Sequence, residues 1–163
     1  MSKIFGYYLE GPDGVGLDKA WYDSSNVKYS ECVDKEGELK TIRVVFNNGS
    51  QYEYKGVDVS DYMLLREDTS QGKALNKYIK GKKYEYARLD DRDIEKLDDE
   101  LRERLDGYLF VSYEGGVFTV RNNVDVVLYE KSGLSDETVS VVCDILVSTG
   151  NKVKLNGVKY GKQ

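Results

Sequence analysis

The sequence contains no histidine, so the commonest general base of enzymes and the catalytic triads built on it are missing. Carboxylates are abundant, and a pair such as Asp90 and Asp91 could bind a metal or act as acid and base. These two residues stand where a helix cap is expected, however. Tyrosine, lysine and arginine remain, and these side chains bind planar rings and anions without transforming them. We therefore expect a non-catalytic binding protein with no cofactor and no metal.

Cysteine is scarce too: the sequence contains only Cys32 and Cys143. Their spacing matches no metal-binding motif. We expect both to be reduced, buried thiols. No stretch approaches the roughly 18 apolar residues that would cross a bilayer. The short apolar run near the N-terminus is broken by Gly6 and does not resemble a signal peptide. A cytoplasmic protein without membrane association is expected.

Proline occurs once, at Pro12, inside a run of turn-forming residues from Gly11 to Gly16. This glycine-rich run lacks the Lys and Ser/Thr of a phosphate-binding loop. It also lacks the strand-to-helix spacing of a dinucleotide fingerprint. An ordinary loop is the favoured interpretation, and phosphate binding is the alternative.

What the sequence has in quantity is tyrosine, with 14 residues against 4 Phe and 1 Trp. Tyrosine can bury its ring and keep its hydroxyl wet, which suits a partly exposed sheet. The net charge of −5 argues against non-specific binding to duplex nucleic acid. Charge is uneven, however: residues 72–88 contain six cations and one anion, whereas residues 89–106 contain nine acids and four bases. The basic segment is either an anion-binding patch or a solvated helix end.

Alternating hydrophobicity and turn residues predict several strands in the first half of the chain. Residues 39–46 form one strand, with Leu39, Ile42, Val44 and Phe46 on its apolar face. Other strands are predicted at residues 4–9 and 50–54. The turns between strands are predicted at residues 23–26, 35–37 and 47–49, the last being Asn-Asn-Gly.

The strand at residues 50–54 places Tyr52 and Tyr54 together on one face, and Gln51 and Glu53 on the other. Two interpretations are open. The two rings either pack on the domain's helix and fill the core, or form a stacking platform for bases, as strand aromatics do in binders of single-stranded nucleic acid.

Helical periodicity follows from Val57 to Leu65, with Asp58 or Ser60 as the cap. A helical or turn-like segment resumes over residues 73–79 and ends at Gly81. Residues 83–89 then alternate as a strand with a second Tyr-x-Tyr at Tyr84 and Tyr86.

A helix is predicted over residues 88–106, with Asp90 or Asp91 as its cap and Gly107 just beyond its end. Its apolar stripe, Ile94, Leu97, Leu101 and Leu105, packs within the chain or forms a dimer seam. Strands are expected at residues 108–113, 117–120 and 124–129. Residues 136–147, capped by Ser135, form a helix or a strand, and residues 152–160 form a hairpin about Asn156-Gly157.

The order of these features resembles the KTSC domain, a family found at the end of some lysyl-tRNA synthetases and alone in many bacterial and phage proteins. The resemblance covers residues 23–89. The matching residues are Ser24-Ser25-Asn26, Phe46-Asn47-Asn48-Gly49, Tyr52-Glu53-Tyr54, Gly56-Val57, Tyr62, Ser70-Gln71-Gly72, Leu75-Asn76, Ile79 and Tyr84. Asp58 stands where the family has Pro, and Leu75 where it usually has an aromatic residue.

The resemblance implies a small α+β fold, an RNA-binding role suggested by the link to a tRNA synthetase, and no catalytic residues. We predict an α+β protein in which a small antiparallel sheet with a helix is followed by a helix and a second β-rich subdomain. Its expected parts are an N-terminal strand and loop (1–22), a KTSC-like domain (23–89), an amphipathic connecting helix (90–107) and a β-rich C-terminal subdomain (108–163).

The leading hypothesis is a protein that binds a nucleic acid or nucleotide by aromatic stacking with nearby cations. The candidate ligand-binding residues are Tyr52, Tyr54, Lys73, Lys77, Lys80, Lys82 and Lys83. The alternative is a phage-encoded accessory or counter-defence protein in the host cytoplasm. Such a protein binds a host protein complex or, as a homo-oligomer, sequesters a signalling nucleotide. A structural component of a virion is a third interpretation.

Overall fold

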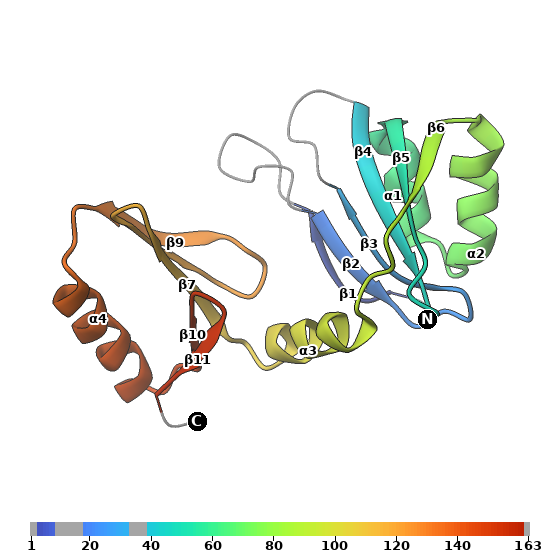
Figure 1. Cartoon of the computed structure of the whole chain (residues 1–163). Helices are drawn as coiled ribbons and strands as arrows, with labels where there is room; N and C mark the ends of the chain where they lie inside the picture. The colour runs from blue at the N-terminus through green and yellow to red at the C-terminus, as the bar shows by residue number, and fades with distance from the viewer. Residues whose placement is uncertain (1–2, 9–17, 33–38, 162–163) are drawn as a thin grey trace. The chain divides into compact units, whose positions relative to one another are not determined.

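The structure, a computed structural model, describes residues 3–8, 18–32 and 39–161. The chain forms two compact units, Met1–Leu101 and Arg102–Gln163, and helix α3 (Ile94–Leu105) begins in the first and ends in the second. Each unit combines one sheet with helices, so the protein has the α+β fold that the sequence predicts (Figure 1). The predicted glycine-rich loop at residues 11–16 and the predicted turn at residues 35–37 lie outside the described residues.

The first unit contains an antiparallel sheet in which each described strand pairs with the next one along the chain. The strands are β1 (Lys3–Tyr8), β2 (Asp18–Tyr22), β3 (Val27–Cys32), β4 (Leu39–Phe46), β5 (Gln51–Asp58) and β6 (Glu85–Leu89). The predicted turn at Asn47-Asn48-Gly49 joins β4 to β5, and Gly49 has a φ of 92°, which glycine adopts without steric cost.

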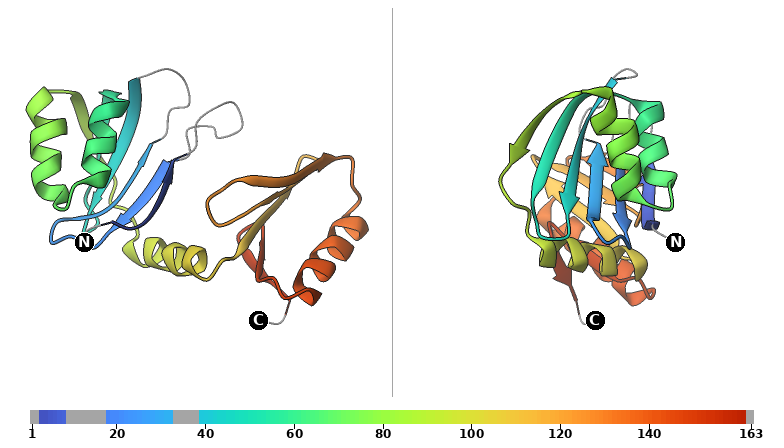
Figure 2. Two further views of the ribbon diagram at one scale, coloured as in Figure 1. Left: turned by 180° about the vertical axis from the view of Figure 1, so that it is seen from behind. Right: turned by 90° about the vertical axis from the view of Figure 1, so that its right-hand side faces the viewer.

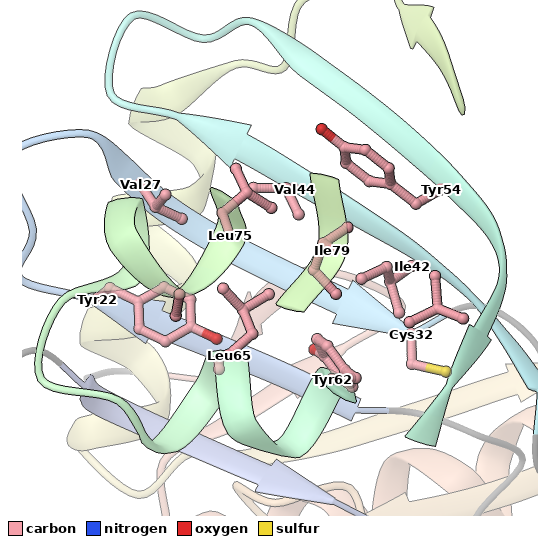
Figure 3. Packing of buried hydrophobic residues seen from close by; sticks show 13 residues of the cluster. Tyr22, Val27, Cys32, Ile42, Val44, Tyr54, Tyr62, Leu65, Leu75 and Ile79 are labelled. Atoms are coloured by element: carbon pink, nitrogen blue, oxygen red, sulfur yellow. The ribbon is translucent and has the colours of Figure 1, made fainter. Parts of the chain in front are cut away.

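Between β5 and β6 the chain makes a helical excursion that covers one face of this sheet (Figure 2). Its parts are α1 (Val59–Glu67), α2 (Gln71–Ala74), a π-helical turn (Leu75–Ile79) and a 3-10 turn (Lys80–Lys82). Side chains from the excursion, such as Leu65 and Ile79, pack on Ile42 and Val44 of β4 (Figure 3). This packing forms the main core of the unit.

The predicted apolar face of β4 is wrong at its first residue. Ile42 and Val44 are fully buried and Phe46 packs against the same core, whereas Leu39 is 58% exposed. The pairing with β5 is irregular between Lys40 and Ile42. The extra residue lies in β5, so the side chains of β4 alternate regularly, and Leu39, three residues before Ile42, points to the opposite face.

The opposite face of the sheet is covered by the first part of α3. Trp21 and Tyr29 pack there with Leu97, and the Trp21 Nε1 donates a hydrogen bond to the Leu97 carbonyl at 3.0 Å. Ile94 and Leu101 contact the same cluster. Packing within the chain therefore accounts for three residues of the predicted stripe, and the fourth, Leu105, is 55% exposed.

The ends of α3 agree with the prediction only in part. The helix begins at Ile94, and the Asp93 carboxylate accepts a hydrogen bond from the Lys96 amide at 3.3 Å. Asp93, and not Asp90 or Asp91, therefore caps the helix. Gly107 follows the helix with a φ of 79°, as expected of a residue that ends a helix in the left-handed conformation.

The second unit contains a sheet with the strand order β11-β10-β7-β8-β9. The strands are β7 (Leu109–Glu114), β8 (Val117–Arg121), β9 (Val127–Ser132), β10 (Val153–Leu155) and β11 (Val158–Tyr160). The predicted meander and hairpin are confirmed, although β9 starts three residues later than expected because a turn occupies residues 122–125. The parallel pairing of β10 with β7 was not predicted.

Helix α4 (Asp136–Ser148) packs on the second sheet, which settles the choice between helix and strand for this segment. Ser135 caps the helix as predicted, since its side chain accepts a hydrogen bond from the Thr138 amide at 3.2 Å. Val139 and Cys143 bury their side chains against Phe118. The β-branched side chains of α4 are tolerated because tertiary packing outweighs their weak helix propensity.

Both cysteines are buried, and neither forms a disulfide. Within the described part of the chain, the helices are all too short or too polar to cross a membrane.

A chain of polar side chains lies inside the core of the first unit. The Ser30 hydroxyl is hydrogen-bonded to the hydroxyls of Tyr22 and Tyr62, at 2.7 and 3.1 Å. Tyr62 also donates to Asp18 Oδ1 at 3.2 Å, and Arg66 Nε lies 3.4 Å from the same oxygen. Asp18 is fully buried, and its Oδ2 has no hydrogen-bond partner among the described residues. The carboxylate is therefore held in a poorly solvated place.

Burial raises the pKa of Asp18 from 3.8 to about 7, although the Arg66 guanidinium, the Tyr62 hydrogen bond and Lys3 act in the opposite direction. Glu67 raises the pKa further. Because the same carboxyl in the unfolded chain titrates near 3.8, the folded state holds an extra proton between these two pKa values. The folded state is thus favoured most at low pH, and this contribution is lost as the pH rises through about 7.

We therefore predict that Asp18→Asn removes part of the pH dependence of stability. In the unaltered protein Asp18 should add about 2 kcal/mol to the free energy of unfolding at about pH 5.5 relative to about pH 8. Urea unfolding of both proteins at the two pH values measures the difference. The matched control is Asp23→Asn, at an exposed carboxylate, which should keep the pH dependence. An unchanged dependence in Asp18→Asn would contradict the prediction.

Candidate functional site

A pocket of about 850 Å³ lies on the helix-bearing face of the first sheet. Its lining combines aromatic rings, lysines and small polar side chains. The lining residues are Ser25, Asn26, Phe46, Asn47, Asn48, Ser50, Tyr52, Tyr54, Lys80, Lys83, Tyr84 and Tyr86. They come from two turns of the sheet, from β4, β5 and β6, and from the end of the helical excursion.

Four aromatic rings from three neighbouring strands form one side of the pocket. Phe46 and Tyr52 meet edge to face at 5.9 Å between ring centroids. Tyr86 lies 6.5 Å from Tyr52 and 6.0 Å from Tyr54. The pairing of β5 with β6 places Tyr54 directly opposite Tyr86, so both rings point to the same face of the sheet.

The predicted alternation of β5 is confirmed. The side chains of Gln51 and Glu53 bond on the other face, where Gln51 Oε1 accepts from Arg92 Nε at 3.1 Å. Glu53 pairs with Arg43 at 3.0 Å. These polar contacts fix the face of β5 that points away from the pocket. Tyr52 and Tyr54 lie on the opposite face, which lines the pocket.

Tyr52 and Tyr54 take part in both the core and the pocket. Tyr54 is only 3% exposed and belongs to the main core, whereas Tyr52 is half-buried against it. Figure 3 shows Tyr54 at the margin of the packed residues. Tyr86, beside them, is 67% exposed. The two interpretations of the sequence are therefore not exclusive, because one side of each ring packs and the other lines the pocket.

The hydroxyls of these three tyrosines are available to a ligand. Among the described residues, none of Tyr52, Tyr54 and Tyr86 hydrogen-bonds through its hydroxyl. Burial, together with the neighbouring Tyr52 and Tyr86 hydroxyls, raises the pKa of Tyr54 to about 12. Tyr54 is thus a neutral hydrogen-bond donor and acceptor over the whole physiological range.

Two of the five predicted lysines line the pocket, Lys80 and Lys83. Lys80 Nζ lies 6.0 Å from the centroid of the Phe46 ring, within reach of a cation–π contact. Lys82 Nζ lies 4.0 Å from an Asp61 oxygen, and Lys77 Nζ lies 5.2 Å from the Tyr78 ring. Together with the exposed Lys73, these two lysines lie outside the lining. The structure therefore brings together Tyr52, Tyr54, Lys80 and Lys83 of the predicted set.

The polar rim is built by two turns that are bonded to each other. Ser24 Oγ accepts hydrogen bonds from the amides of Asn26 and Val27, at 3.2 and 3.3 Å. Asn47 Nδ2 donates to the Ser24 carbonyl at 2.8 Å, and the Asn47 amide donates to the Asn26 carbonyl at 2.9 Å. These bonds hold the two turns together and fix the side chain of Asn47 at the border of the pocket.

Sequence reasoning missed most of this rim and two of the rings, Phe46 and Tyr86. The repeated Tyr-x-Tyr of Tyr84 and Tyr86 was a usable signal for the second ring, because neighbouring antiparallel strands align residues of one face. From the sequence, Asn26, Asn47 and Asn48 were interpreted only as turn-forming residues. Their place at a pocket depends on the meeting of two turns, which no local pattern reveals.

The segment Ser70-Gln71-Gly72 connects the parts of the helical excursion through the side chain of Gln71. Gln71 is fully buried, and its Nε2 donates to the Asp68 carbonyl at 2.7 Å and to the Leu65 carbonyl at 3.4 Å. A Cβ at Gly72 would lie 2.8 Å from Asn26 Nδ2. A residue with a side chain at this position would therefore displace the amide of Asn26, which lines the pocket.

The lining can bind a ligand through ring faces, hydroxyls, amides and two ammonium groups. The described part of the chain has no group of three or more Cys, Asp or Glu side chains placed to hold a metal ion. The first unit is thus a small α+β domain with an aromatic pocket next to its helical layer.

Residues 33–84 match the family model of the KTSC domain, and this match confirms the resemblance drawn from the sequence. The matched segment includes β4, β5 and the helical excursion, and with them nine of the twelve lining residues. Ser25, Asn26 and Tyr86 lie just outside it. A comparison with curated proteins finds no match.

We predict that Gln71→Ala lowers the free energy of unfolding by about 2–4 kcal/mol, because it leaves a cavity and removes the donor to the Leu65 and Asp68 carbonyls. Urea unfolding measures the change. Asn76→Ala, at an exposed position of the same excursion, is the matched control and should change stability by less than about 0.5 kcal/mol. Equal effects of the two substitutions would contradict this role of Gln71.

Proposed function

We propose that the pocket binds a nucleotide, free or as a unit of a single-stranded nucleic acid, and that the protein is a non-catalytic binder. The observation that supports this proposal most is the convergence of five aromatic rings, four of them tyrosines, and two lysines on one pocket of about 850 Å³. Pockets that bind small ligands commonly have volumes of about 300–1,000 Å³.

The exposed ring of Tyr86 supports a stacking role. A ring that is 67% exposed gains little from the fold and offers a face to a planar partner. Stacking of a base on an aromatic side chain contributes about 1–3 kcal/mol. The unbonded hydroxyls of Tyr52 and Tyr54 can bond to the polar edge of the base.

The two lysines supply the charge that a phosphate group needs. The whole chain carries a net charge of −5, so a broad electrostatic attraction to duplex nucleic acid is not expected. Positive charge in the lining comes instead from Lys80 and Lys83, next to the rings. This distribution favours a ligand that presents one base and a nearby phosphate, and it disfavours a long regular helix.

We predict that Tyr86→Ala weakens nucleotide binding about tenfold or more, and that Tyr86→Phe retains most of it, because stacking needs the ring. Calorimetric titration with the four ribonucleoside 5′-monophosphates and with short single-stranded RNA measures the affinities. Tyr129→Ala removes a partly exposed strand tyrosine from the second unit and should leave binding unchanged.

The affinity for RNA should also fall as salt concentration rises, because lysine–phosphate pairing releases counterions. Absence of binding to every one of these probes at low salt would contradict the proposed function. Tighter binding of a mononucleotide than of RNA would favour the nucleotide-sequestering role over an RNA-binding one.

A further inference from the structure

Among the described residues, three other than glycine have a positive φ: Lys83 at 59°, Asp125 at 61° and Asn156 at 49°. This left-handed conformation brings Cβ close to the backbone, and only Asn and Asp tolerate it well among residues with a side chain. At each of these three positions, the side chain should therefore make a contact that offsets the cost of the conformation.

For Asn156 and Asp125, contacts within the chain explain why a residue other than glycine is present. Asn156 accepts a hydrogen bond from the Tyr113 amide at 2.9 Å and donates one to the Tyr113 carbonyl at 3.3 Å. Asp125 is buried and pairs with Arg104 at 3.3 Å. A glycine at either position would lose these contacts.

Lys83 differs from both. It ends the helical excursion, where its amide donates to the Lys80 carbonyl at 3.2 Å, and this is a position that favours glycine. Its side chain is exposed and makes no hydrogen bond or ion pair with another described residue. The helix dipole favours a cation near this end, but Lys80 and Lys82 already supply two in the last turn.

The Lys83 side chain does, however, line the pocket. The other lysine of the lining, Lys80, lies 6.0 Å from the Phe46 ring. Lys82, next in sequence, lies outside the lining and near Asp61. Lys83 is therefore the cation of the excursion's end that has strained backbone, an unbonded ammonium group and a place in the pocket.

We propose that Lys83 stands in this strained position because its ammonium group binds the phosphate of the ligand. The pocket then takes phosphorylated nucleosides in preference to uncharged ones, with the tyrosine rings holding the base and Lys83 the anion. The inference rests on the proposed function and adds to it a specificity-determining residue and a ligand class. Backbone strain at a residue that lines a binding site is the pattern expected when the side chain serves the ligand.

The test compares each ribonucleoside 5′-monophosphate with its nucleoside, by protein-observed NMR titration of the full chain. The unaltered protein should bind the monophosphate about tenfold more tightly than the nucleoside, as a charge-assisted contact provides. Lys83→Gly should reduce this preference to within about twofold, and Lys83→Arg should keep it. Glycine accommodates a φ of 59°, so the melting temperature of Lys83→Gly should equal or exceed that of the unaltered protein.

Lys82→Ala is the matched control, since it removes the same charge from the neighbouring residue outside the lining. It should keep the preference for the monophosphate. An equal loss in Lys82→Ala, an undiminished preference in Lys83→Gly, or a lower melting temperature of Lys83→Gly would each overturn this inference while binding by the unaltered protein still upholds the proposed function. Failure of the unaltered protein to bind any probe would overturn both.

Discussion

The pairing of β5 with β6 is the constraint on which the pocket depends. It aligns Tyr54 with Tyr86 across two strands that are separated in sequence by the whole helical excursion. The start of β6 is secured by Tyr84, whose hydroxyl donates to Asp61 at 2.6 Å and accepts from the Asp58 amide at 3.3 Å. These contacts connect the end of the helical excursion to its beginning. They thereby place Lys80 and Lys83, near its end, next to the aromatic rings of the pocket.

The face of the sheet behind the pocket and the polar chain in the core give this arrangement its rigidity. Arg92 spans Gln51 and Glu31 on the back of the sheet, and its guanidinium lies 5.5 Å from the Tyr29 ring. Asp18 of β2 pairs in the core with Arg66 of α1, and a misplaced strand would leave two buried charges without partners. Buried charge pairs add little net stability, but they penalise alternative packings. The rings are thus presented by a strand that is held from both sides.

Much of the first unit could be predicted because it is encoded in short patterns. The Asn-Asn-Gly turn and the alternation around Tyr52 depend on local backbone preferences. Leu39 was assigned to the wrong face although strict alternation already separates it from Ile42, which lies an odd number of residues further on. It was harder still to predict which of the lysines line the pocket. A π-helical turn at Leu75–Ile79 changes the rotation between Lys73 and Lys80, so regular helical spacing does not tell which lysines share a direction.

The sequence by itself determined the α+β class, the main turns, the cap at Ser135 and the presence of a KTSC-like segment, because each depends on residues close together in the chain. Only the tertiary structure decided that Asn26, Phe46, Lys83 and Tyr86 surround one pocket. It also decided that β10 lies parallel to β7. These facts depend on contacts between segments far apart in sequence, whose partners are chosen by packing and burial and not by any local pattern.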